Sequence, residues 1–175
     1  MKYDEAKHLL KNYKKIIVTG PQRSGTTIAS RIIAQDMGLT YLDESSFNTI
    51  DIICFHNRTV TYQNYVMQCP CFFHVLEALY CIAPDAALVV MIRDIESIQA
   101  SQERIKWCDS HDKNIIGAFN DDRPISVIDY ENYVRQKSKL AFGDIVELEY
   151  DSLADHSMFV EKSKRVNFLP RQWSE

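Results

Sequence analysis

The chain of 175 residues lacks a basic excess. Its 20 lysines and arginines are outnumbered by 24 aspartates and glutamates, which gives a formal net charge of −4. A protein without an overall positive field does not attract nucleic acid or anionic membranes by charge alone, so we expect neither as a partner. The sequence contains no apolar run of about 18 residues, and residues 1–14 contain no apolar core long enough for a signal peptide. We therefore expect a cytoplasmic protein.

Paired cysteines are also missing. The five cysteines form no Cys-x-x-Cys pair. Cys69 and Cys71 are separated by a single proline, which is too tight for a zinc knuckle, and no histidine or cysteine partner stands at metal-ligand spacing. This pattern predicts free thiols, as in proteins of a reducing compartment. We expect no metal site.

Short apolar runs alternate with segments in which apolar residues recur at helical spacing. The runs at 16–18 and 87–92 predict buried strands of a parallel sheet. The sequence has no internal repeat, low-complexity stretch or linker. Residues 1–175 are therefore expected to form a single α/β domain with three layers, a parallel sheet with helices on both faces. Further strands are expected at 39–42, 65–67 and 144–150, and helices at 3–13, 26–37, 72–82, 95–107, 130–140 and from 151 onward.

Two stretches resist this assignment. Residues 47–66 fit a strand and a helix alike, and His56-Asn57-Arg58 within them indicates a turn. The polar residues 108–127 indicate a loop or lid. Residues 162–173 form a basic tail.

A glycine-containing loop follows the first predicted strand and opens a helix. Gly20-x4-Gly25-x-Thr27 has the spacing of a phosphate-binding loop, but Thr26 stands where a lysine is expected. The basic residue is Arg23, three places earlier and inside the loop. Because backbone N–H groups and the helix dipole converge at such a turn, the segment predicts an anion site.

Two further groups are expected near this loop. Arg93 ends a predicted strand, and Ser101 follows eight residues later, so a hydroxyl can lie beside the guanidinium and suit a second phosphate. A salt-bridged arginine at a strand end is the alternative. Glu44 follows the neighbouring strand, where it can accept a proton from an attacking hydroxyl or serve only as a solvated loop acid.

In this order along residues 14–155, the motifs resemble those of the P-loop sulfotransferases that use 3′-phosphoadenosine 5′-phosphosulfate (PAPS). Residues 20–27 (GPQRSGTT) look like the 5′-phosphosulfate loop of that family, and residues 91–94 with Ser101 are similar to its 3′-phosphate motif. Residues 84–87 and 149–153 resemble two further family segments. The resemblance implies a P-loop NTPase-like fold and metal-free transfer of a sulfuryl group from PAPS to an acceptor hydroxyl, leaving adenosine 3′,5′-bisphosphate.

The resemblance also implies a role for each matched residue. Arg23 would contact the bridging and 5′-phosphate oxygens and stabilise charge on the leaving group, and Glu44 would be the general base. Arg93 and Ser101 would bind the 3′-phosphate, which distinguishes PAPS from ATP. The remaining cofactor contacts would come from the loop residues Gln22, Ser24, Gly25, Thr26 and Thr27.

The chain departs from the family where Gln68 replaces a lysine that touches the transferring sulfuryl group. Glutamine donates a hydrogen bond but brings no positive charge, which leaves a non-catalytic nucleotide-binding module as one alternative. His56 is a distant substitute for Glu44 as the base. The tail residues Lys162, Lys164 and Arg165 are candidates for further phosphate contacts.

A second alternative is a Mg-ATP-dependent kinase of a nucleotide or small molecule, with Asp94 as its magnesium acid; the missing lysine beside Gly25 counts against it. The acceptor, whether a small alcohol, a carbohydrate or a tyrosine of a peptide, is not indicated by the sequence, nor is the oligomeric state. Acceptor specificity is expected to lie in residues 43–66 and 108–127.

Overall fold

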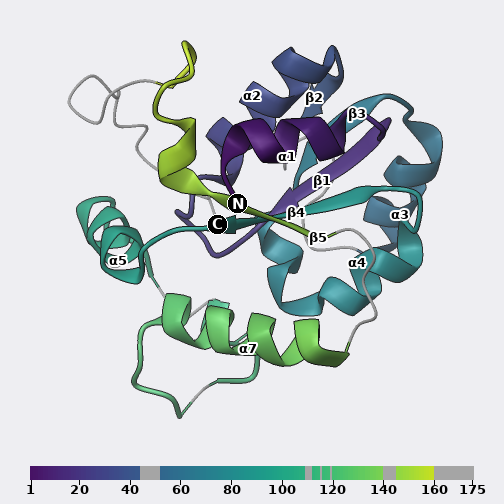
Figure 1. Ribbon diagram of the computed structural model, residues 1–175. Helices are drawn as coiled ribbons and strands as arrows, with labels where there is room; N and C mark the ends of the chain where they lie inside the picture. Colours follow the sequence, from purple (N-terminus) through teal and green to yellow (C-terminus); the bar gives the residue numbers. More distant parts are fainter. Residues whose placement is uncertain (44–51, 109–111, 115, 119, 140–144, 160–175) are drawn as a thin grey trace.

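The computed structural model describes residues 1–43, 52–108, 112–114, 116–118, 120–139 and 145–159 (Figure 1). Its centre is a five-stranded sheet in the order β2-β3-β1-β4-β5, in which every strand pair is parallel. This order places β1, the strand before the glycine loop, between β3 and β4. The strands are β1 (Lys15–Thr19), β2 (Thr40–Leu42), β3 (Tyr65–Gln68), β4 (Ala87–Ile92) and β5 (Ile145–Glu149).

Helices cover both faces of the sheet. Alternate residues of β1 enter two separate cores: Ile16 and Val18 pack on the side of α1 and α2, and Ile17 packs on the side of α3, α4 and α7. Figure 1 shows α1 and α2 on one face and α4 and α7 on the other. The fold is therefore the predicted three-layer α/β fold of the P-loop NTPase-like type. The helices are α1 (Tyr3–Leu10), α2 (Thr26–Met37), α3 (Ile52–Thr61), α4 (Leu76–Ile82), α5 (Ile95–Arg104) and α7 (Ile125–Lys139), with 3₁₀ turns η2 (Pro70–Val75) and η3 (Tyr150–Leu153).

The predicted turn at His56-Asn57-Arg58 is wrong, because these residues lie inside α3. Phe55 and Thr59 are one helical turn apart and face the core, which leaves the three polar residues between them on the exposed side. An exposed helical face of polar residues has the same composition as a turn. Helix boundaries differ as well: α7 begins five residues before the predicted start, and the predicted helix at 72–82 is divided into η2 and α4.

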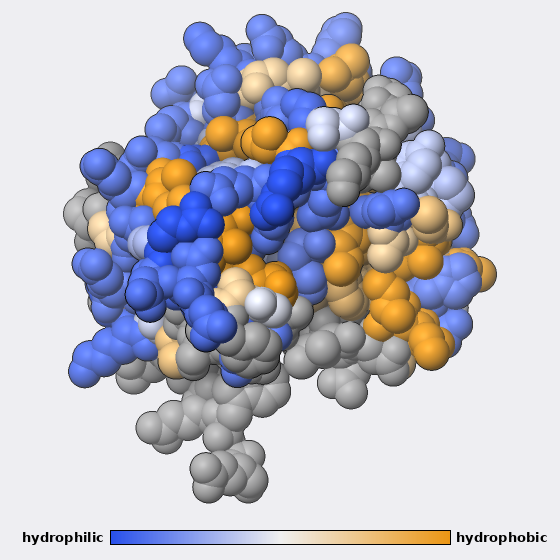
Figure 2. Space-filling model, turned by 90° about the horizontal axis from the view of Figure 1, so that it is seen from below, coloured by the Kyte–Doolittle hydropathy of each residue, from blue (hydrophilic) through white to orange (hydrophobic). Residues whose placement is uncertain are grey.

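Apolar side chains are exposed at several places, including Leu9 of α1 and Val134 of α7. Figure 2 shows one group of hydrophobic residues at the right of the view from below, where α3 and α4 lie in Figure 1. Ile53 and Val60 of α3 and Tyr80 of α4 are exposed. The described residues include all five cysteines, and none of them forms a disulfide. Among the described residues, no helix combines the length and apolar character that crossing a membrane requires.

Candidate active site at the carboxyl edge of the sheet

The glycine loop forms a tight turn between β1 and α2. The Ser24 N–H donates to the Pro21 carbonyl (3.0 Å), and the Thr19 hydroxyl at the end of β1 donates to the Cys69 carbonyl after β3 (2.9 Å). Arg23 has a φ of 73° and Gly25 a φ of 103°. The loop is thus closed on itself and tied to the neighbouring strand, with the first turn of α2 directly behind it.

The turn requires glycine at its start. A Cβ on Gly20 would lie 2.7 Å from Ser24 Oγ, closer than real Cβ contacts allow, and a tight 3.0 Å from the Cβ of Met91. The hydroxyl of Ser24, a residue of this loop, is fully buried and has no hydrogen-bond partner among the described residues. A buried polar atom left unpaired is uncommon and marks a site where a partner is missing or strain is stored.

The structure brings three of the predicted site residues together. One guanidinium nitrogen of Arg93, Nη1, donates to the Arg23 carbonyl oxygen (2.7 Å), and Arg23 Nε donates to Ser101 Oγ (3.3 Å). Arg93 has no carboxylate partner among the described residues. Two guanidinium groups therefore converge on one edge of the sheet, which favours an anion there.

Two tyrosines that the sequence analysis did not assign to the site also hold Arg93. The Tyr130 hydroxyl of α7 accepts from the Arg93 backbone N–H (2.9 Å), and burial raises the pKa of Tyr130 to about 12. The Arg93 guanidinium lies 4.1 Å from the centre of the Tyr150 ring. In the sequence, Tyr150 stands within residues 149–153, which resemble a family segment. Its position directly after a strand, at the edge where ligands bind in parallel sheets, is the signal that could have identified it.

Gln68, the residue in place of the family lysine, is buried at the end of β3 beside Val18 of β1. Its Oε1 accepts a hydrogen bond from the Tyr41 hydroxyl (2.7 Å), which leaves the amide Nε2 as the donor. The position can therefore supply an N–H group but no charge.

Glu44 lies outside the described residues, as do Lys162, Lys164 and Arg165, so their roles stay predictions. His56 is exposed on α3. Asp94, the acid of the kinase alternative, accepts from the Ser97 N–H (2.8 Å) and caps the N-terminus of α5, which occupies one of its carboxylate oxygens.

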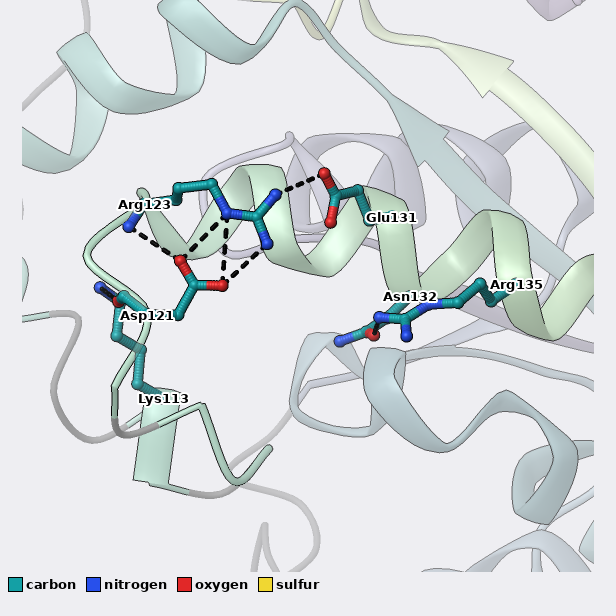
Figure 3. Close-up of polar contacts among 6 residues, drawn as sticks. All are labelled: Lys113, Asp121, Arg123, Glu131, Asn132 and Arg135. Carbon is teal, nitrogen blue, oxygen red and sulfur yellow. Dashed lines mark hydrogen bonds and ion pairs between the residues drawn. The ribbon is translucent and has the colours of Figure 1, made fainter.

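The predicted lid region contains an ion-pair cluster beside a cavity of about 380 Å³. Figure 3 shows Arg123 between Asp121 and Glu131, with hydrogen bonds to both carboxylates. Hydrogen bonds from Arg123 lower the pKa of Asp121 to about 2. The charge of Arg123 is thus neutralised within the cluster. On α7 the cavity is bordered by Ile128, Asn132 and Arg135.

Comparison with known proteins gives distant structural likenesses. No family model and no curated protein matches the chain. Shikimate kinase from Acinetobacter baumannii, in complex with shikimate, is 13% identical with a TM-score of 0.43 and covers 78% of this chain and 99% of its own. The YorR protein of Bacillus subtilis, in complex with phosphorylated GDP, is 12% identical with a TM-score of 0.47, covering 82% and 89%. An uncharacterized protein from Eubacterium ventriosum is 13% identical with a TM-score of 0.40, covering 77% and 87%. Because the likenesses are this distant, we infer substrate and chemistry from the residues of this chain.

Proposed function

We propose that this protein is a sulfotransferase that takes a sulfuryl group from PAPS and transfers it to an acceptor hydroxyl. The observation that carries the proposal is the meeting of Arg23, Arg93 and Ser101 at the carboxyl edge of the sheet. A glycine loop with its own arginine suits one phosphate group. The second arginine, Arg93, is joined to the Ser101 hydroxyl through Arg23, and this group suits another phosphate on the same ligand.

The residues at this edge of the sheet supply enough hydrogen-bond donors of the right kind for the two phosphate-bearing ends of PAPS. The loop and the first turn of α2 offer backbone N–H groups and the exposed hydroxyl of Thr27 for the 5′ side. Among the described residues, the Arg93 side chain donates one hydrogen bond within the protein, and a guanidinium carries five N–H donors. Its remaining N–H edges and Ser101 serve the 3′-phosphate. The other loop contacts in the proposal come from Gln22, Ser24, Gly25 and Thr26.

The chemical step needs a base and a stabiliser of the leaving group. We assign the base to Glu44, which accepts the proton of the acceptor hydroxyl as its oxygen attacks sulfur. Arg23 stabilises the negative charge that develops on the departing 5′-phosphate oxygen. Gln68 donates one neutral hydrogen bond where the family has a charged one. The acceptor is a small alcohol, a carbohydrate or a peptide. The cavity beside α7 is lined in part by residues 116–123, which belong to one of the two stretches expected to recognise the acceptor.

The second candidate is a Mg-ATP-dependent kinase. One solved structure with a similar fold is a kinase, and none of the three reported above is named as a sulfotransferase. The comparison therefore accords better with this alternative, although structures of such low similarity carry no argument about chemistry. The residues of this chain point the other way: Thr26 replaces the loop lysine, and the Asp94 carboxylate caps α5.

A thermal-shift titration separates the candidates. A ligand at 100 times its dissociation constant adds about 2.7 kcal/mol to the free energy of unfolding, which for a chain of this size raises the melting temperature by roughly 5–11 °C. We expect that shift with adenosine 3′,5′-bisphosphate in the presence of EDTA, and expect Arg93→Ala to abolish it. Arg58→Ala, an exposed arginine on α3, is the matched control and should leave the shift unchanged.

The other outcomes are equally informative. A shift only with ATP and magnesium would overturn the sulfotransferase proposal in favour of the kinase. Bisphosphate binding without sulfuryl transfer to any hydroxyl in an acceptor panel would indicate the non-catalytic module. If transfer occurs, Glu44→Gln should abolish it while leaving bisphosphate affinity nearly unchanged.

A further inference from the structure

The Tyr150 ring contacts both the glycine loop and Arg93. A Cβ built on Gly25 would lie 2.3 Å and 2.5 Å from two ring carbons of Tyr150, so the loop backbone rests directly against this ring. The Arg93 guanidinium lies 4.1 Å from the ring centre. One aromatic side chain therefore touches both of the elements to which we assign phosphate groups.

The Tyr150 ring is buried and packs against a second aromatic ring. Tyr150 belongs to η3, directly after β5, and only 6% of its surface is exposed. The Phe159 ring packs against it with a centroid separation of 5.5 Å. Because the ring cannot easily turn, it offers Arg93 a fixed surface.

A fixed surface restricts where the guanidinium can direct its hydrogen bonds. The group is planar and carries its N–H donors at its edges, so contact with the ring leaves those edges able to bind an anion. The hydrogen bond from Nη1 to the Arg23 carbonyl sets the rotation within that plane. Contact with the ring and one in-plane bond together fix the orientation of the remaining donors.

We propose that Tyr150 is the positioning residue that orients Arg93 toward a 3′-phosphate and thereby sets the preference for nucleotides phosphorylated at both the 3′ and 5′ positions. This inference rests on the proposed function, because it assigns Arg93 to the 3′-phosphate. Tyr150 does not itself contact the ligand in this proposal. It acts through the placement of Arg93.

The test compares two ligands in each variant by isothermal titration calorimetry. The measured quantity is the ratio of the dissociation constants of adenosine 5′-monophosphate and adenosine 3′,5′-bisphosphate, which isolates the 3′-phosphate and cancels a general loss of folded protein. Tyr150→Phe retains the ring and should keep the wild-type ratio. Tyr150→Met fills the space without a π face and should lower the ratio about tenfold. Tyr133→Met, a buried tyrosine on the other face of the sheet, is the matched control and should keep it.

An unchanged ratio in Tyr150→Met would overturn the inference. If that variant does not fold, Tyr150→Leu provides the same test, because leucine also fills the space without a π face. We expect Tyr150→Leu to lose about tenfold of the preference, and full retention would overturn the inference. A wild-type protein with no preference for the bisphosphate would instead refute the proposed function itself, and the inference with it.

Discussion

Replacing Gly25 with alanine tests how closely the glycine loop and Tyr150 are packed. The added methyl group would stand 2.3 Å from Cδ2 and 2.5 Å from Cε2 of the Tyr150 ring, at a backbone φ of +103°. Favourable carbon–carbon contacts lie at about 3.5–4.0 Å, so the ring must retreat by more than about 1 Å. It has little room to do so, because Tyr150 is buried against Phe159.

Two costs add in this variant. A non-glycine residue at such a φ costs about 1–3 kcal/mol, and overpacking a filled core costs about 1–3 kcal/mol more. We expect Gly25→Ala to lower the free energy of unfolding by about 4 kcal/mol in total. Gly38→Ala provides the matched control, since Gly38 also has a positive φ (+65°) but nothing lies within 4 Å of its Cβ position. Its cost is the backbone term alone, about 1 kcal/mol.

The difference between the two variants, about 3 kcal/mol, corresponds to a difference of roughly 6–12 °C in melting temperature. Differential scanning calorimetry of the wild type and both variants without ligand measures it directly. Equal melting temperatures for Gly25→Ala and Gly38→Ala would refute the contact between the loop and Tyr150. The placement of Arg93 on the same ring would then lose its structural basis.

Three further variants test other parts of the structure. Asp36→Asn should lower the free energy of unfolding by about 2 kcal/mol at pH 7. Burial raises the pKa of this carboxyl, but hydrogen bonds from three neighbouring side chains outweigh that effect and hold it below its usual value. Its contribution is therefore present above pH 4 and should shrink below about pH 4 in urea titrations; a constant difference down to pH 2 would contradict this. Burial raises the pKa of Tyr130 from 10.0 to about 12, so the stability that its neutral hydroxyl contributes is present below pH 10 and lost between pH 10 and 12. The free energy of unfolding of the wild type should therefore fall by about 2–3 kcal/mol more than that of Tyr130→Phe over that range. Equal decreases in the two proteins would contradict the raised pKa. Tyr41→Phe removes the hydrogen bond to the buried Gln68 side chain and should cost about 1–3 kcal/mol in urea denaturation, whereas a change within the error of the measurement would show that Gln68 finds another partner.

The parts of the fold that the sequence predicted correctly are those that short-range patterns determine. The run at 87–92 is apolar without interruption and forms β4, the neighbour of β1. The glycine spacing that begins at Gly20 forms a loop before α2, as predicted. Both signals depend on residues adjacent in sequence. In α3 the same reasoning failed, because the exposed face of an amphipathic helix and a polar turn have the same composition.

The contacts that build the site join residues far apart in the chain, and no local pattern predicts them. The spacing of Arg93 and Ser101 predicted that they lie near each other, and the structure connects them through Arg23. Tyr130 comes from α7 and Tyr150 from the end of β5, and both reach Arg93 only because β4 is adjacent to β5 and α7 packs beneath the sheet. Their roles follow from strand order, which the sequence does not reveal.

These contacts also mean that the two elements to which we assign phosphate groups are not independent. Arg93 holds the carbonyl of Arg23, 70 residues away, while the Arg23 side chain reaches Ser101 on α5. Under the proposed function, a substitution at Arg93 therefore removes a donor for one phosphate and loosens the loop assigned to the other. Loss of binding in Arg93→Ala alone would not distinguish these effects. Comparing ligands that differ only in the 3′-phosphate does, because a loosened loop weakens both ligands equally, whereas a lost 3′-phosphate contact weakens only one.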